Sequence, residues 1–255
     1  MASWSTKRQL LYLGIVFGTL LLIGSFSLYK ALNPAPSCTD GKQNQNETGI
    51  DCGGVCSNAC VSGVLPLITL WSRVLPAGEG AYDAAGFIEN PNLNAGIPAI
   101  AYTFKLYDKD NILVAEKSGK TFVNPNERFT LFESGIETGR RIPLRAFLEF
   151  QPGPQWKQSM AQKPPLVVQN KKFTSGDKPL LEADVVNRSF DPQPNVIVVA
   201  TLFDSNDNVF AASKTVINRL VPDAPEAIFF TWPKALSENP ARIEIVPRVS
   251  VFSGR

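Results

Sequence analysis

The chain contains no histidine among its 255 residues. Imidazole is the usual general base near neutral pH and the commonest metal ligand, so Ser-His-Asp and Cys-His catalytic groups are excluded. A hydrolase that works with two carboxylates is compatible with this absence, but nothing in the sequence singles out two of the 23 acidic residues. We therefore predict a protein that is not an enzyme and needs no cofactor.

Long blocks of like charge are also missing. The net charge is +2, and no basic run is longer than a pair such as Arg140-Arg141 or Lys171-Lys172. Proteins that bind nucleic acid concentrate positive charge on one face or along one helix, so no nucleic-acid partner is expected. The hydrophobic content of 44% is enough for one large domain or two ordinary ones.

Charge is absent altogether from the twenty residues between Leu10 and Tyr29. A helix of that length spans roughly 30 Å, the thickness of the hydrocarbon core of a bilayer. We predict a transmembrane helix at 9–30 that follows a cytoplasmic tip at 1–8 and acts as a signal anchor. A cleaved signal peptide with its cut near Ala31 or Ala35 is the alternative, although such peptides have shorter apolar regions.

Two features predict which side of the membrane the rest of the chain occupies. Lys7 and Arg8 precede the apolar run, and positive residues favour the cytoplasmic side. All four cysteines follow the run, and clustered cysteines are typical of oxidising compartments. Both features indicate a single-pass protein of the cell membrane with residues 31–255 outside the cytoplasm.

The cysteines lie close together in a segment rich in Gly and Asn, at Cys38, Cys52, Cys56 and Cys60. An even number in a short segment predicts two disulfides with one of three pairings. We interpret 31–60 as a Pro-rich spacer and a Cys-rich collar. Zinc held by four thiolates is the alternative, although the usual close cysteine pairs are missing.

Calcium is a weaker hypothesis for the same segment. Asp40, Asn44, Glu47 and Asp51 offer oxygen ligands, and part of the set follows the spacing of a twelve-residue EF-hand loop. The loop lacks the central Gly and the final bidentate Glu, so an EF-hand is not expected. A looser calcium site and simple capping of backbone groups both remain open.

The Cys-rich pattern C-x-D-G-x-x-N-x-x-E-x-G-I-D-C-G-G-x-C-x-x-x-C resembles a short module of secreted and surface-exposed proteins. The likeness covers residues 38–60 only. It implies an extracytoplasmic, stalk-like setting and carries no activity.

Beyond Cys60, short runs rich in Val, Ile, Phe and Thr alternate with turn residues, which is typical of antiparallel β-structure. In AIAYTFKLYD, one face of the predicted strand holds Ile100, Tyr102, Phe104 and Leu106. The following KDN predicts a hairpin turn into ILVAEK. The ectodomain is therefore expected to be all-β.

The ectodomain also contains an internal repeat of about 97 residues. LYDKDNILVAEK matches LFDSNDNVFAASK, and FIENPN matches DVVNRS. The period is close to the size of one immunoglobulin-like sandwich. We predict tandem domains at 61–150 and 166–255, joined by a Pro-containing linker at 151–165.

The segment FKLYD, which ends at Asp108, resembles the FxLYD signature of small β-sandwich domains on bacterial surface proteins. The second copy keeps it in part as ATLFD, which ends at Asp204. The resemblance implies two tandem immunoglobulin-like antiparallel β-sandwiches with a binding or structural role and no active site.

Three functions follow in order of preference. The first is an interaction or structural module of the cell envelope that binds an envelope or surface protein through turns at Asp110, Asn111, Asp207 and Asn208. The second is a cell-wall glycan binder that uses Trp156 in the linker, since Trp71 and Trp232 are expected in the core. The third is a carboxylate-based hydrolase.

Overall fold

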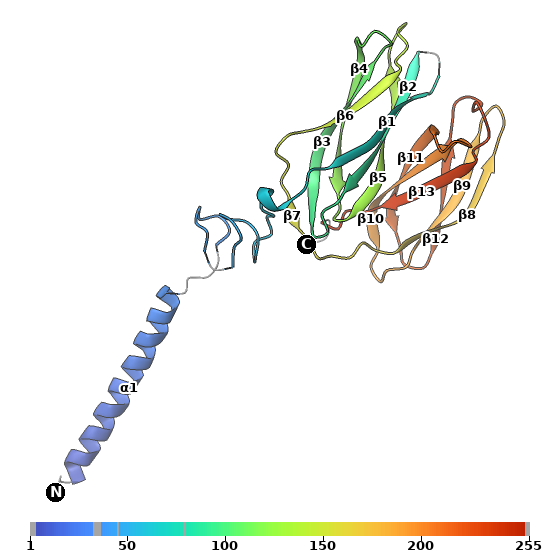
Figure 1. Ribbon diagram of the computed structural model, residues 1–255. Coiled ribbons are helices and arrows are strands. Elements are labelled where there is room, and N and C mark those ends of the chain that lie inside the picture. Colours follow the sequence, from blue (N-terminus) through green and yellow to red (C-terminus); the bar gives the residue numbers. More distant parts are fainter. Residues whose placement is uncertain (1–3, 33–36, 45, 79, 253–255) are drawn as a thin grey trace. The chain divides into compact units, whose positions relative to one another are not determined.

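The computed structural model describes residues 4–32, 37–44, 46–78 and 80–252 (Figure 1). The chain divides into two compact units, Met1–Val55 and Cys56–Arg255. The boundary falls inside the predicted collar at 31–60. The start of the predicted cytoplasmic tip and the Pro-rich part of the spacer lie outside the described residues.

The first unit contains helix α1, Trp4–Leu32, with 29 residues. At about 1.5 Å per residue the helix is roughly 44 Å long. The hydroxyls of Thr19 and Ser25 donate to backbone carbonyls three or four residues earlier, so these polar groups are satisfied within the helix. The mean hydropathy of its apolar window is 2.0. By length and composition α1 can cross a bilayer.

In the described part of the second unit, the strands form four antiparallel sheets (Figure 1). The first two sheets are β1-β2-β5 and β4-β3-β6, built from β1 Ile68–Pro76, β2 Ala81–Asn90, β3 Ala95–Tyr107, β4 Leu113–Val123, β5 Glu127–Glu137 and β6 Arg145–Phe150. A short strand, β7 Lys157–Gln158, pairs with the beginning of β3. We refer to these two sheets as the first sheet pair.

The other two sheets are β12-β9-β8 and β11-β10-β13. Their strands are β8 Leu166–Thr174, β9 Leu180–Asn187, β10 Gln193–Phe203, β11 Val209–Leu220, β12 Pro225–Thr231 and β13 Arg242–Arg248. We refer to them as the second sheet pair. The predicted architecture of one apolar helix followed by antiparallel β-structure is confirmed.

Each sheet pair encloses its own apolar core, as in a β-sandwich. In β3 the four residues predicted to share one face, Ile100, Tyr102, Phe104 and Leu106, are all buried in the first core. Trp232 belongs to the second core, as predicted. Alternation along the strand therefore indicated correctly which side chains fill the space between two sheets.

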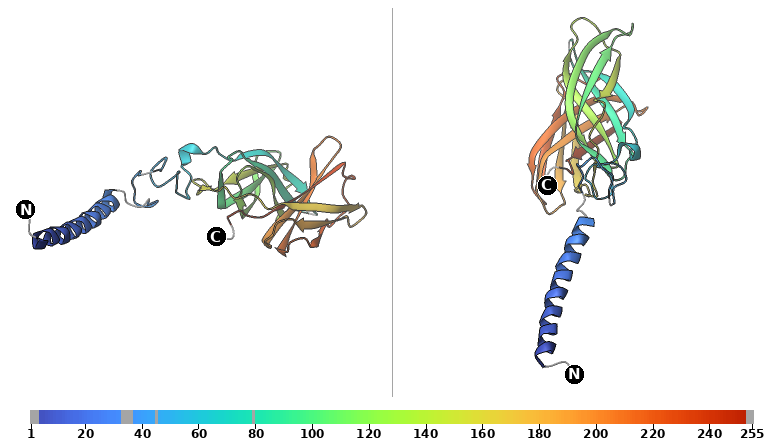
Figure 2. Two further views of the ribbon diagram at one scale, coloured as in Figure 1. Left: turned by 90° about the horizontal axis from the view of Figure 1, so that it is seen from below. Right: turned by 90° about the vertical axis from the view of Figure 1, so that its left-hand side faces the viewer.

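The two sheet pairs also pack against each other, and Figures 1 and 2 show their strands side by side. The outer face of sheet β1-β2-β5 meets the outer face of sheet β11-β10-β13 in a third apolar cluster. Its buried members are Leu75, Ala85 and Phe132 on one side, and Val199, Phe203, Val209 and Ala212 on the other. Trp71 is half-buried at this contact and stacks on Phe87, so it belongs to neither sandwich core.

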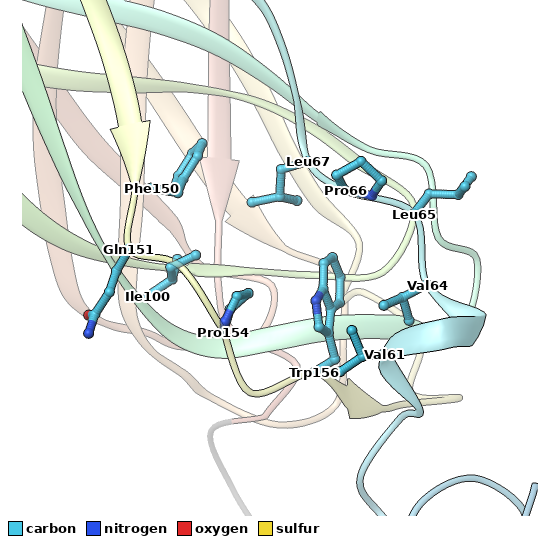
Figure 3. A pocket seen from close by; sticks show the side chains of 10 residues that line it. All are labelled: Val61, Val64, Leu65, Pro66, Leu67, Ile100, Phe150, Gln151, Pro154 and Trp156. Atoms are coloured by element: carbon cyan, nitrogen blue, oxygen red, sulfur yellow. The ribbon is translucent and has the colours of Figure 1, made fainter. Parts of the chain in front are cut away.

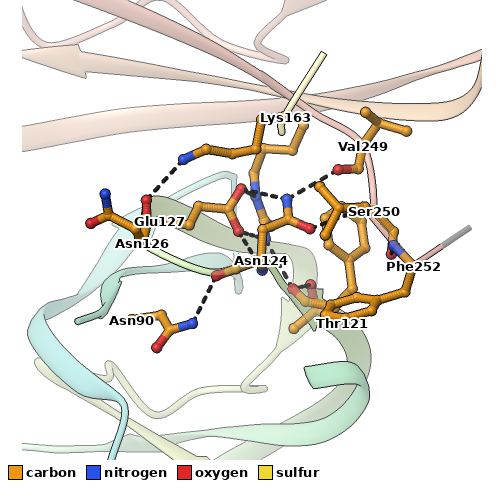
Figure 4. A network of polar contacts seen from close by, with 12 residues as sticks. Asn90, Thr121, Asn124, Asn126, Glu127, Lys163, Val249, Ser250 and Phe252 are labelled. Carbon is orange, nitrogen blue, oxygen red and sulfur yellow. Dashed lines mark hydrogen bonds and ion pairs between the residues drawn. The ribbon is translucent and has the colours of Figure 1, made fainter. Parts of the chain in front are cut away.

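A buried ion pair lies at the same contact, and Figure 4 shows its acidic member, Glu127, next to Asn124. Arg248 donates from Nε and Nη2 to the Glu127 carboxylate at 3.0 and 2.9 Å. Asn124 donates to the Val249 carbonyl at 3.0 Å and accepts from the Val251 N–H at 3.0 Å. The chain after β13 is thus bonded to the first sheet pair.

The segment expected to be a linker, 151–165, is partly built into the first sheet pair. It contains β7, and Trp156 is 7% exposed within the first core. The prediction of an exposed Trp156 is wrong. Pairing of β7 with β3 places Trp156 in the first core, against which Ala59, Val64 and Leu67 also pack, an arrangement that local composition does not reveal.

Candidate functional site

An uncharged pocket lies beside Trp156, between the segment that leads into β1 and the segment that follows β6 (Figure 3). Its volume is about 420 Å³. The lining residues are Val61, Val64, Leu65, Pro66, Leu67, Ile100, Phe150, Gln151, Pro154 and Trp156. None of these ten described residues is charged or titratable, so the pocket offers apolar contact and no acid-base chemistry. We refer to it as the Trp156 pocket.

One wall of the pocket is fixed by a pair of asparagines. The Leu65 N–H donates to the Asn92 side chain at 2.8 Å, and the Asn92 amide donates back to the Leu65 carbonyl at 2.8 Å. Asn92 in turn donates to the side chain of Asn90 at the end of β2, which is fully buried. The segment before β1 is therefore held at a defined position on the first sheet pair.

The opposite wall is fixed through the backbone around Trp156. The Ala59 N–H donates to the Trp156 carbonyl at 3.0 Å, and the Gln158 N–H donates to the Ser57 carbonyl at 2.8 Å. The Lys157 ammonium donates to the Asn58 side chain at 2.6 Å. Because both walls are bonded to the same sheet pair, the pocket is preformed.

The indole N–H of Trp156 is a donor without an acceptor in the described part of the chain, although 93% of the residue is buried. Trp232, which is equally buried, donates its indole N–H to the Ala212 carbonyl at 3.1 Å. The Trp156 N–H has no such partner, and its nitrogen is not among the fully buried unpartnered atoms of the described residues, so water can reach it. In Figure 3 the Trp156 ring stands among the lining side chains of the pocket. The pocket therefore presents the indole N–H of Trp156, together with the carboxamide of Gln151, on an otherwise apolar surface.

The predicted loop residues Asp110 and Asn111 lie at the exposed turn between β3 and β4. Asp108 accepts from the N–H groups of Asp110 and Ile112 at 3.0 and 2.9 Å, which confirms that it initiates the turn. Asn111 has a φ of 61°, a left-handed conformation that Asn tolerates. Both side chains of the predicted pair are accessible.

The second predicted pair, Asp207 and Asn208, lies in a turn with the same bonding pattern between β10 and β11. Asp204 accepts from the N–H groups of Asn206 and Asn208 at 2.8 Å each. These bonds, first that from Asn208, hold the pKa of Asp204 below its ordinary value. Within the described part of the chain no hydrogen bond or ion pair joins this turn to Asp110 and Asn111, so the two predicted pairs are not in contact.

The side chains of Asp207 and Asn208 both accept hydrogen bonds from arginines. Arg242 donates from Nε and Nη2 to the Asp207 carboxylate at 3.0 and 2.8 Å, and it also donates to Glu244. Arg73 donates to the side chain of Asn208 at 3.4 Å. Asp207 lines a groove of about 360 Å³ between the two sheet pairs, with Leu70, Trp71, Phe87, Thr130, Phe203, Arg242 and Glu244. We refer to it as the Trp71 groove.

The four oxygen-bearing residues of the calcium hypothesis are joined by hydrogen bonds. Asp51 accepts from the N–H groups of Asp40 and Gly41 at 2.9 and 3.0 Å. Asp40 accepts from the Asn44 amide at 2.9 Å, and Glu47 accepts from the Asn44 N–H at 3.2 Å. The three carboxylates are not all within 4.8 Å of one another. Capping of the loop backbone accounts for these contacts.

The four cysteines are all disulfide-bonded, as predicted. The alternative of a zinc ion held by four thiolates is wrong, because a sulfur in a disulfide cannot act as a thiolate ligand.

Sequence reasoning missed the Trp156 pocket. Its walls come from two segments about 90 positions apart, and Asn92, which fixes Leu65, ends the repeated segment FIENPN, whose match gave no sign of a contact with Leu65. The only local signal was a tryptophan among prolines, which is also typical of an exposed linker.

Comparisons with protein-family models and with curated proteins found no match for this chain.

Proposed function

We propose that this chain is a single-pass, membrane-anchored binding or structural module of the cell envelope, not an enzyme, which binds an envelope or surface protein. The observation that carries this proposal is the preformed, uncharged Trp156 pocket with its unpartnered indole donor. A site of this kind suits recognition better than catalysis, because its lining provides no titratable group for acid-base or nucleophilic chemistry.

The proposed topology has the N-terminus in the cytoplasm and the residues after α1 outside it. The apolar helix and the disulfide-bonded cysteines support this arrangement. Alkaline phosphatase, which needs an oxidising compartment for its own disulfides, is a suitable reporter. Fused after the second sheet pair and expressed in bacteria, the phosphatase is expected to be active. An inactive fusion of normal abundance would indicate the opposite orientation in the membrane.

We propose further that the two sheet pairs are tandem immunoglobulin-like domains of FxLYD type, derived by duplication. Two pairs of matching contacts support this proposal. Asn90 and Asn187 end β2 and β9, and each donates its buried amide to two backbone carbonyls. Asp108 and Asp204 each cap the turn that follows the central strand of a sheet.

A photo-crosslinking amino acid placed at two exposed aliphatic positions tests the binding function. Val61 at the pocket is 77% exposed, and Ile142, which lies outside the pocket, is 65% exposed. In the native membrane we expect one defined protein to be crosslinked from position 61 and not from position 142. Equal labelling from both positions, or labelling of lipid alone, would contradict a protein partner at this site.

Glycan binding is a second candidate, favoured by the Trp71 groove. Trp71 stacks on Phe87 opposite Arg242, whose carboxylate neighbours could bond sugar hydroxyls. If a glycan binds there, Trp71→Ala is expected to abolish sedimentation of the chain with insoluble cell-wall polymer, whereas Trp156→Phe leaves it unchanged. If both variants still sediment with the polymer, the Trp71 groove is not a glycan-binding site.

A further inference from the structure

We propose that the Trp156 pocket binds an extended, uncharged, proline-containing segment of a partner protein, and that a backbone carbonyl of this segment accepts the Trp156 indole N–H. The inference rests on the proposed binding function and specifies the chemistry of the partner. It joins three properties of the pocket, which are its lack of charge, its aromatic and proline lining, and the indole N–H that has no acceptor among the described residues.

The lack of charge excludes charged ligands. A charged group that entered the pocket would lose hydration and find no opposite charge among the lining residues. An uncharged apolar segment buries surface that water hydrates only weakly. Removing such surface from water lowers the free energy of binding. The segment that occupies the pocket is therefore apolar where it contacts Val64, Leu67 and Phe150.

The lining resembles, in its chemistry, the grooves on which polyproline II segments dock. Pro66, Pro154, Phe150 and Trp156 provide flat, rigid surfaces that lose little side-chain entropy on binding. A polyproline II segment is itself stiff and has no internal hydrogen bonds, so all its carbonyls are available as acceptors. Both partners are then ordered before they meet, which limits the entropic cost of association.

The indole N–H offers a hydrogen bond at a defined place, which water can accept while no ligand is bound. Trp156 is 7% exposed and its N–H has no partner among the described residues. A peptide carbonyl placed over the pocket would complete this bond, whereas a purely hydrocarbon ligand would cover the donor without replacing its water. The donor therefore favours a peptide backbone over an alkyl chain.

The walls cannot easily close over the space if it is empty. Asn92 holds Leu65 by two hydrogen bonds of 2.8 Å, and the Trp156 carbonyl accepts from Ala59. This preorganisation predicts that binding changes the backbone of the first sheet pair very little.

Selection of short random peptides on phage against the full chain in detergent micelles tests the proposal. We expect the selected sequences to be uncharged and enriched in proline. A fluorescent synthetic peptide of the selected consensus is then titrated against the full chain and its variants. Val61→Asp places a charge at the exposed rim and is expected to weaken binding at least about tenfold. The matched control Ile142→Asp is expected to bind as the wild type does.

The variant Trp156→Phe measures what the indole N–H contributes to binding while an aromatic side chain is kept in the pocket wall. It keeps a six-membered aromatic ring and removes the pyrrole part of the indole together with its N–H, so binding is expected to weaken by at least about three- to tenfold, the worth of one hydrogen bond. Selection of charged peptides, equal binding by Val61→Asp, or failure to select any peptide would overturn the proposal. A lipid that copurifies with the wild type and is lost in Val61→Asp would also overturn it, in favour of an acyl chain.

The crosslinking experiment distinguishes failure of this inference from failure of the proposed function. A protein crosslinked from another surface would leave the binding module intact and remove only the pocket as its site.

Discussion

Arg248 is the residue whose surroundings are least visible in the sequence. Its guanidinium is buried, bonded to Glu127, and lies 3.6 Å from the centre of the Phe129 ring. Removal of one partner of a buried ion pair leaves the other charge without compensation. We predict that Arg248→Met lowers the free energy of unfolding by about 3–5 kcal/mol. Urea denaturation at neutral pH measures this loss, and the double variant Arg248→Met with Glu127→Leu is expected to recover much of it.

The same ion pair predicts a pH dependence of stability. Burial by itself would raise the pKa of Glu127, but attraction and hydrogen bonds from Arg248, together with hydrogen bonds from Asn124, outweigh burial and lower it. A lowered pKa in the folded state adds stability above the unfolded pKa, near 4.5, and this contribution is lost as the pH falls.

Denaturation series at neutral and acidic pH check this dependence. The wild type is expected to lose more stability below pH 4.5 than Glu127→Gln does. Equal slopes for the two proteins would assign the acid sensitivity to other carboxylates.

A smaller effect is expected at Asp108, which accepts two backbone N–H groups in the turn after β3. Asp108→Ala leaves these donors to water, and we predict a loss of about 1 kcal/mol in the free energy of unfolding. Asp110→Ala is the control, because the Asp110 side chain makes only an exposed ion pair with Lys109. If Asp108→Ala and Asp110→Ala lower the free energy of unfolding equally, the hydrogen bonds accepted by Asp108 do not stabilise the fold.

For single residues, sequence patterns predicted the features that depend on contacts between residues close together in the chain. The turn at Asp108 and the buried face of β3 depend on residues within a few positions of each other, so alternation and turn chemistry were sufficient. The pairing of Glu127 with Arg248 and the burial of Trp156 depend on contacts between distant segments. A single sequence contains no signal for such contacts, and both were missed.

Among the elements, sheets β1-β2-β5 and β11-β10-β13 make the contact that joins the two sheet pairs. Ala212 on β11 is buried in this contact and lies outside the two sandwich cores. We predict that Ala212→Glu separates the unfolding of the two sheet pairs, because a carboxylate without a partner would be buried between them. Calorimetry is expected to resolve two transitions in the variant and one in the wild type.

Val216→Glu provides the control for that experiment. Val216 lies on the same strand, but its side chain is exposed. A single transition in both variants, with unchanged midpoints, would mean that the contact does not couple the two sheet pairs.

The strands themselves were largely predictable, since runs of Val, Ile, Phe and Thr between turn residues became antiparallel sheets. The packing of one sheet pair on the other was not. Phe132 and Phe203 at the contact look in the sequence like ordinary core residues, because alternation tells which residues share a face and not what covers that face.

For the whole molecule, the disulfides and the sheets are predicted to contribute separately to stability. No cysteine lies in a strand, so reduction is expected to loosen the Cys-rich segment while the calorimetric transition of the sheets keeps its midpoint. The measurement is calorimetry with and without a reducing agent. A large fall in the midpoint would show that the crosslinked segment supports the sheets directly.

The contact between the sheet pairs joins two different faces, and this has a consequence for assembly. Contacts between unlike faces can in principle add copy after copy into an open fibre. The two sheet faces left outside each carry an ion pair beside an exposed phenylalanine: Lys105 with Glu149 at 2.7 Å near Phe147, and Lys172 with Glu182 at 3.8 Å near Phe229. Stacking onto these faces would bury those charges at a cost. The charges on the outer faces therefore oppose the addition of further copies through the kind of contact that joins the two sheet pairs within one chain.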